Sequence, residues 1–219
     1  MTEAMAQPGH ASAPDEELYR REAMGAFAHE VRTPLTSIRM VLELARREGT
    51  NGELVLDGEL AGMLDASVDD LQQLADDLQE ASRLERGRLV LNAGPCDLAA
   101  AVAAARELLP RDLELAGDVP EGIEGPWDIA RLVRALAGFT VAANRGGNGS
   151  GTVTLSVDEG IETVRVTVTS GEAAGEARLI AADCGFSFFR SRLFVTAMGG
   201  AVDYDRRERY LSISLALPR

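Results

Sequence analysis

The residues best suited to chemistry surround His29, in the segment Phe-Ala-His-Glu-Val-Arg-Thr-Pro-Leu over residues 27–35. Histidine is largely neutral near pH 7, so one ring nitrogen keeps a free lone pair that can attack phosphorus. Glu30 follows directly and can accept the proton of the other ring nitrogen, which orients the ring. Thr33 lies four residues on, on the same face of a helix, where it can reach a phosphoryl group or hold a water.

Two amphipathic helices are expected to position these side chains. Apolar residues recur every three or four positions from Met24 to Ala45, and again from Leu60 to Ala81. Residues 49–52, Gly-Thr-Asn-Gly, predict a turn between them. Two helices alone bury too little apolar surface, so we expect the hairpin to pair with a second copy as a four-helix bundle. The alternative is that the hairpin packs on its own C-terminal domain.

Proline at position 34 adds a local feature to the first helix. It has no N–H and clashes with the carbonyl four residues back, that of Glu30, so a bend is expected there.

From residue 88 the pattern is mixed α/β. Helices are predicted over residues 97–109, 127–144 and 186–198, and strands over residues 88–92, 152–157, 163–169, 201–204 and 210–217. A sheet with helices on one face, an α/β sandwich, accommodates this order. The glycine-rich run over residues 146–151 is interpreted as a connector, because no lysine follows it and it comes after a helix.

Composition excludes several classes of protein. The 219 residues carry a formal net charge of −13, and no Lys/Arg cluster offers a footprint for nucleic acid. Cys96 and Cys184 are far apart without metal-ligand spacing, so we expect buried apolar residues in a reducing compartment and no metal site. No apolar run approaches the ~20 residues that span a bilayer, and the N-terminus lacks signal-peptide features. We therefore expect a soluble, cytoplasmic protein that does not bind membranes.

Two segments resemble a known family. Residues 27–35 resemble the H-box of the dimerisation and phosphotransfer domain of bacterial sensor histidine kinases, whose histidine carries a phosphoryl group. Residues 71–89, which contain Ser-Arg-Leu-Glu-Arg-Gly, are similar to the end of the second helix of that domain, with Gly87 as the helix stop. The order of elements after residue 88 is similar to the ATP-binding domain of the family, which has a Bergerat fold.

These observations predict three parts. Residues 1–14 lack periodicity and are expected to form a disordered tail. Residues 15–87 are expected to form a dimerisation and histidine phosphotransfer hairpin, paired in a dimeric four-helix bundle. Residues 88–219 are expected to form a degenerate histidine-kinase ATPase-like α/β sandwich.

The three motifs that hold ATP and Mg²⁺ in the family are each altered here. At the two asparagine positions of the asparagine box stand Gly138 and Ala142, which cannot ligate a cation. Ser170 replaces the aspartate that reads adenine, and the Gly-x-Gly-Leu segment is Gly-Phe-Ser-Phe over residues 185–188. The lid between the last two motifs is too short to close over a nucleotide. The resemblance therefore implies that the chain binds no nucleotide cofactor.

A phosphoacceptor histidine without an ATP site must receive its phosphoryl group from a partner. The donor implied is the aspartyl phosphate of a response-regulator receiver domain, which also supplies the Mg²⁺. We therefore expect a histidine phosphotransferase of a two-component phosphorelay, which relays a phosphoryl group between receiver aspartates through His29. Ser187 and Arg190 are candidate contacts for the partner.

Three alternatives stay open. The first is a pseudokinase that binds a kinase or a receiver without transfer. The second is an aspartyl-phosphate phosphatase in which Thr33 positions water. The third is an active histidine kinase with an unorthodox ATP site.

Overall fold

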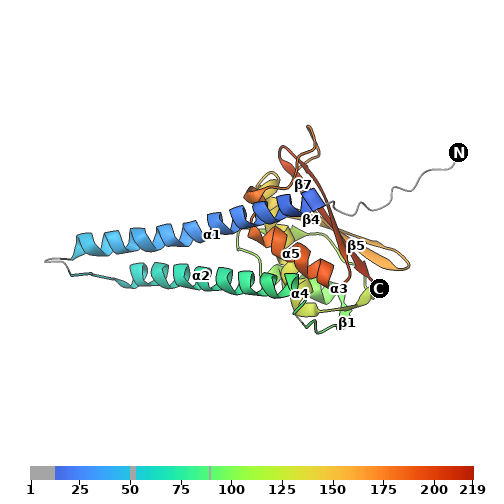
Figure 1. Ribbon diagram of the computed structural model, residues 1–219, viewed down its shortest axis with the longest axis horizontal. Helices are drawn as coiled ribbons and strands as arrows, with labels where there is room; N and C mark the ends of the chain where they lie inside the picture. The colour runs from blue at the N-terminus through green and yellow to red at the C-terminus, as the bar shows by residue number, and fades with distance from the viewer. Residues whose placement is uncertain (1–12, 50–52, 89) are drawn as a thin grey trace.

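The chain begins with a helical hairpin that extends away from an α/β domain (Figure 1). The computed structural model describes residues 13–49, 53–88 and 90–219. Helices α1 (Ala13–Glu48) and α2 (Gly58–Glu85) form the hairpin. The predicted disordered tail lies outside the described residues up to residue 12, and so does most of the predicted turn. Since α1 begins at Ala13, the helix starts slightly earlier than the sequence predicted.

Local interactions set the ends of α2. The side chain of Asp57 accepts a hydrogen bond from the N–H of Leu60 at 2.8 Å and caps the first turn. At the other end Gly87 has a φ of 61°, and its N–H binds the carbonyl of Leu84. The prediction that Gly87 stops the helix is therefore confirmed. Pro34 is buried within α1, which continues as a helix on both sides.

The α/β domain is built on a five-stranded sheet of order β2-β4-β5-β7-β6, in which only β2 and β4 are parallel neighbours. The alternating apolar residues of β5 and β7 are buried and form one core with α4 and α5. A separate antiparallel pair joins β1 to β3. The helices are α3 (Leu98–Glu107), α4 (Ile129–Gly146), η1 (Ala182–Cys184) and α5 (Phe186–Ala197). The strands are β1 (Gly94–Asp97), β2 (Glu114–Ala116), β3 (Glu124–Trp127), β4 (Thr152–Glu159), β5 (Thr163–Ser170), β6 (Ala201–Arg207) and β7 (Tyr210–Pro218).

Most predicted elements are confirmed, with ends shifted by a few residues, but one strand is not. The strand predicted over residues 88–92 is wrong, since the described residues there have no strand structure and β1 begins at Gly94. The N–H of Asn92 binds the carboxylate of Asp128 at 2.9 Å instead of a neighbouring strand. The short strands β2 and β3 were not predicted, because three or four residues give no clear alternation.

The base of the hairpin packs on the α/β domain of the same chain. Ala26 of α1 and Ala81 of α2 are buried in the same apolar core as Phe186 and Phe189 of α5. The ring of Tyr19 lies 6.2 Å from that of Phe189, in an edge-on arrangement. The alternative given by the sequence, in which the hairpin packs on its own C-terminal domain, is thus present at the base of the hairpin.

The far half of the hairpin, unlike its base, is not packed against the α/β domain. It exposes large apolar side chains from both helices and from the segment that leads into α2: Leu35, Met40, Leu44, Leu54, Val55, Leu56, Met63 and Val68. Among the described residues, no helix has the length and apolar character that a membrane crossing requires.

Candidate functional site

His29 lies on α1 where this helix passes the α/β domain, and its side chain is exposed. Two residues earlier, Phe27 packs edge-on against Phe186 with ring centroids 5.4 Å apart. One residue later, Glu30 turns toward α4 and α5. Because consecutive residues are about 100° apart around a helix, the imidazole is left on a solvent-facing side. The structure therefore makes His29 accessible to a partner protein.

Glu30 binds the α/β domain. Its Oε1 accepts a hydrogen bond from the guanidinium of Arg145, at the end of α4, and from the N–H of Phe186 at 3.3 Å. The side chain is only 18% exposed. Neighbouring residues on a helix do not face each other, which agrees with this separation from His29. The proton-accepting role predicted for Glu30 stays a prediction, and Arg145 is a neighbour that the sequence did not reveal.

Thr33 is exposed one turn along α1 from His29. Residues four apart share a helix face, so a group bound at the imidazole comes within reach of this hydroxyl. Its role with water or a phosphoryl group stays a prediction.

The two altered asparagine positions are buried in α4, and the first of them, Gly138, lies directly against α5. A Cβ atom at Gly138 would collide with Ser191 Oγ and would lie 3.1 Å from the carbonyl oxygen of Ser187. Glycine thus permits α5 to occupy the space into which an asparagine would project. Ala142 is completely buried. Neither position has a side-chain oxygen atom that could bind a ligand.

The other two altered motifs are also used within the chain. Ser170 is buried, and its hydroxyl binds Asn148 Oδ1 at 3.0 Å. The start of α5, which stands where the family brings backbone N–H groups onto phosphate, holds the carboxylate of Glu30. Gly185 precedes it with a φ of 88°. At each of the three motifs at least one residue therefore contacts another part of this chain.

A buried ionic network joins α2 to α4 and α5. Asp77, whose side chain is 6% exposed, accepts hydrogen bonds from the guanidinium groups of Arg134 and Arg190. Glu80 pairs with Arg134 and, at 3.3 Å, with Arg131. Burial lowers the pKa of Arg190 from its ordinary value, against the opposing influence of Glu30, but an arginine stays charged.

This network corrects one prediction. Arg190 and Ser187 were candidate contacts for a partner, yet Arg190 is 12% exposed and bound to Asp77, and Ser187 Oγ is buried. The Arg190 guanidinium is thus already paired and the Ser187 hydroxyl is shielded, which argues against both as partner contacts. The sequence did not identify Asp77, since nothing in it separates this residue from the other acidic residues of α2.

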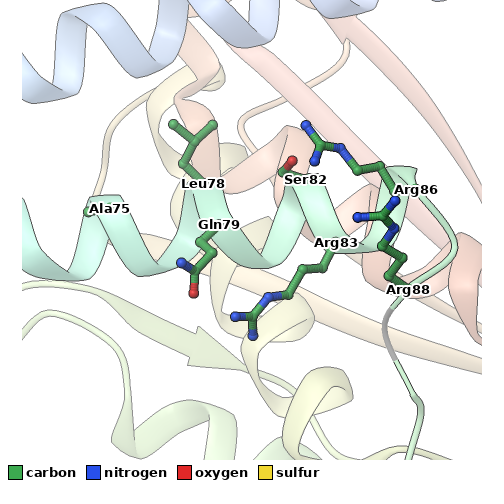
Figure 2. Close-up of a pocket in the computed structure, with 7 residues that line it drawn as sticks. All are labelled: Ala75, Leu78, Gln79, Ser82, Arg83, Arg86 and Arg88. Carbon is green, nitrogen blue, oxygen red and sulfur yellow. The ribbon is translucent and has the colours of Figure 1, made fainter.

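An open groove of about 520 Å³ lies along α2 (Figure 2), and none of the altered motif residues lines it. Three arginines near the end of the helix stand along it, with smaller side chains further up. Its lining residues are Ala75, Leu78, Gln79, Ser82, Arg83, Arg86 and Arg88. Within the described ranges, no three His, Cys, Asp or Glu residues are arranged to hold a metal ion.

Sequence comparison places the hairpin in a known family. Residues 19–87 match the model of the His Kinase A (phospho-acceptor) domain. The matched segment includes His29, most of α1 and all of α2. The chain is 29% identical over 153 residues to the signal transduction histidine-protein kinase BaeS of Escherichia coli, covering 68% of this chain and 32% of BaeS. Residues 19–87 are thus similar to the phospho-acceptor domain of histidine kinases, and the chain is similar to a bacterial sensor histidine kinase over 68% of its length.

A second relative agrees with this assignment. The probable sensor histidine kinase TcrY of Mycobacterium tuberculosis is 33% identical over 138 residues, which are 61% of this chain and 28% of TcrY. The chain thus spans about a third of the length of the curated kinases that it matches.

Solved structures of histidine kinases share the fold. The Acinetobacter baumannii kinase AdeS superposes with a TM-score of 0.62 at 18% identity, covering 87% of this chain and 97% of AdeS. Full-length ShkA in complex with AMPPNP superposes with a TM-score of 0.54 at 22% identity, covering 92% of this chain and 45% of ShkA. The structure of ThkA in complex with the response regulator TrrA gives a TM-score of 0.54 at 18% identity, covering 94% of this chain and 65% of the matched chain. The predicted fold, a helical hairpin followed by an ATPase-like α/β domain, is confirmed.

Proposed function

We propose that this chain is a histidine phosphotransferase of a two-component phosphorelay, which accepts a phosphoryl group on His29 and uses no ATP of its own. One observation carries the proposal: the phosphoacceptor histidine is exposed, whereas α5 packs on the asparagine-box position Gly138. The engagement of Ser170 by Asn148 and of the start of α5 by Glu30 supports it further.

The donor and acceptor in this proposal are receiver domains. A ring nitrogen of His29 attacks the phosphorus of a receiver aspartyl phosphate, the P–O bond to the aspartate breaks, and the carboxylate leaves. Water takes the ring proton, since Glu30 is bound to Arg145 and Phe186, and the receiver supplies the Mg²⁺ that offsets phosphoryl charge. The reverse reaction loads a second receiver. The complex of the similar kinase ThkA with the response regulator TrrA supports this choice of partner.

We further propose that the hairpin pairs with a second copy. The apolar side chains exposed on its far half, Leu35 and Val68 among them, would be covered in a four-helix bundle. Light scattering after gel filtration tests this. Leu35→Asp with Val68→Asp should convert the dimer to a monomer, and the control Leu179→Asp, at an exposed site of the α/β domain, should not. A monomeric wild type contradicts the pairing.

A labelling experiment tests the phosphotransferase function. A receiver that carries labelled aspartyl phosphate is mixed with the chain, and labelled ATP with Mg²⁺ is mixed with the chain alone. We expect acid-labile label from the receiver only, lost in His29→Gln and retained in His10→Gln, which replaces the other of the two histidines in the sequence. Label from ATP alone identifies an active kinase. Stable receiver binding without any label identifies a pseudokinase regulator.

A further inference from the structure

Four residues join the phosphoacceptor turn of α1 to the α/β domain, and we call them the Glu30 clasp. Glu30 supplies the carboxylate, Arg145 the guanidinium and Phe186 a backbone N–H at 3.3 Å. Gly185 lies beneath them at the start of α5. The carboxylate is therefore held from two directions, by the last turn of α4 and by the first turn of α5.

Gly185 is required for this geometry. Its φ of 88° belongs to the left-handed region that side chains other than glycine rarely adopt. A Cβ atom there would lie 2.5 Å from Arg145 Nη1 and 2.8 Å from Glu30 Oε1. The clasp thus depends on the absence of a side chain at Gly185 and on the guanidinium of Arg145.

The electrostatic surroundings favour a fixed carboxylate. The positive end of the α5 dipole faces the Glu30 carboxylate through the N–H of Phe186. The buried guanidinium of Arg190 also interacts electrostatically with this carboxylate. Arg190 itself is bound to Asp77 of α2, which leaves Arg145 as the direct cationic partner of Glu30. A carboxylate that is mostly buried loses much of its stabilisation when such a partner is removed.

We propose that Arg145 is a positioning residue for phosphoryl transfer: it binds Glu30 and so holds the helical turn that carries His29 in a fixed place. This inference rests on the phosphotransferase function proposed above. Transfer needs the imidazole in line with the aspartyl phosphate of a docked receiver, and small misplacements are costly. The α/β domain then contributes to transfer without any nucleotide.

Transfer kinetics with a phosphorylated receiver test the proposal. Arg145 is 47% exposed, so Arg145→Gln should fold. We expect its saturating transfer rate to fall about tenfold, with the half-saturating receiver concentration within about twofold of wild type. Arg145→Lys should restore most of the rate, since it keeps the charge, and Gly185→Ala should resemble Arg145→Gln. In Glu30→Gln, a further Arg145→Gln should change nothing.

The matched control is Arg192→Gln. Arg192 also lies where the hairpin meets the α/β domain, with its guanidinium 4.1 Å from the centre of the Tyr19 ring, but it is no part of the clasp. We expect its transfer rate to be unchanged. An equal loss in Arg192→Gln would assign the effect to domain packing in general. A weaker receiver affinity at unchanged rate would make Arg145 a docking contact. Either result overturns the positioning role.

Amide hydrogen exchange separates this inference from the proposed function. In Arg145→Gln the amide of Phe186 and those of the turn around His29 should exchange faster than in wild type. Unchanged exchange overturns the clasp as a restraint, whatever the transfer rates. A wild-type chain that takes no label from the receiver overturns both the function and the inference. A labelled wild type with an unaffected Arg145→Gln variant overturns the inference alone.

Discussion

Asp77 of α2 and Arg190 of α5 form a buried ion pair that ties the hairpin to the α/β domain. Arg134 of α4 binds the same carboxylate, and its guanidinium also lies 5.3 Å from the centre of the Phe194 ring. These charges are largely removed from water, so each depends on the others for compensation. The orientation of the two parts is therefore fixed by specific charges as well as by apolar contact.

Replacement of Asp77 by alanine should lower the free energy of unfolding by about 3–5 kcal/mol, because two guanidinium groups lose their shared carboxylate. Urea unfolding followed by circular dichroism measures this. The matched control is Asp76→Ala, since Asp76 is the adjacent residue and is exposed, and it should cause no measurable loss. Similar small effects from both substitutions would show that the buried network contributes little.

Substitution of Gly138 by asparagine restores the residue type of the family motif but should destabilise this protein. The new Cβ atom meets Ser191 Oγ in a helix contact that has no free space, and such overpacking costs about 1–3 kcal/mol. Gly62→Asn is the control, because Gly62 is also helical and a Cβ atom there meets nothing within 4 Å. Equal stability of the two variants would contradict the direct packing of α5 on α4.

The features that could be predicted from the sequence are those with a local signal. The spacing of apolar residues in α1 and α2, the stop at Gly87 and the alternation in β5 each lie within one element. The segment around His29 is similarly compact, so its similarity to the family motif and its place on a helix could be predicted from the sequence.

Long-range pairs gave no such signal. Glu30 and Arg145 are 115 positions apart, and Asp77 and Arg190 are 113 apart, so only the fold brings them together. The strand predicted at residues 88–92 failed for a similar reason, since Asn92 binds the distant Asp128. The departures from the family's nucleotide motifs were visible in the sequence, but the contacts that Ser191, Asn148 and Glu30 make at those positions were not.

Thr33→Ala tests whether the chain also removes phosphate from a receiver. If the Thr33 hydroxyl positions water beside a phosphoryl group, receiver dephosphorylation should slow about tenfold while His29 still takes up label. Phosphate release measures the first effect and acid-labile label the second. Thr36→Ala is the control, because Thr36 is exposed on the same helix and its hydroxyl binds the carbonyl of Arg32 at 2.8 Å. Dephosphorylation at the wild-type rate in Thr33→Ala excludes this role.

Asp128 links the start of α4 to the segment before β1. It is buried and accepts hydrogen bonds from the N–H groups of Asn92 at 2.9 Å and Arg131 at 3.2 Å. Burial alone would raise the pKa of Asp128, but these N–H groups and the Arg131 guanidinium outweigh it and hold the pKa below its ordinary value. The ionised carboxylate therefore stabilises the folded chain.

Asp128→Ala should consequently lower the free energy of unfolding by about 2 kcal/mol near pH 7, through the lost cap and the unpaired N–H groups. The pKa is lower in the folded chain than in the unfolded one, where it is about 4. The contribution is thus complete above pH 4 and is lost as pH falls through the folded value. Urea titrations at several pH values should show the wild type and the variant converging in acid. For Asp118→Ala, at an exposed site, the free energy of unfolding should depend on pH as it does in the wild type. A difference between wild type and Asp128→Ala that stays constant into strong acid would mean that ionisation of Asp128 does not contribute to stability.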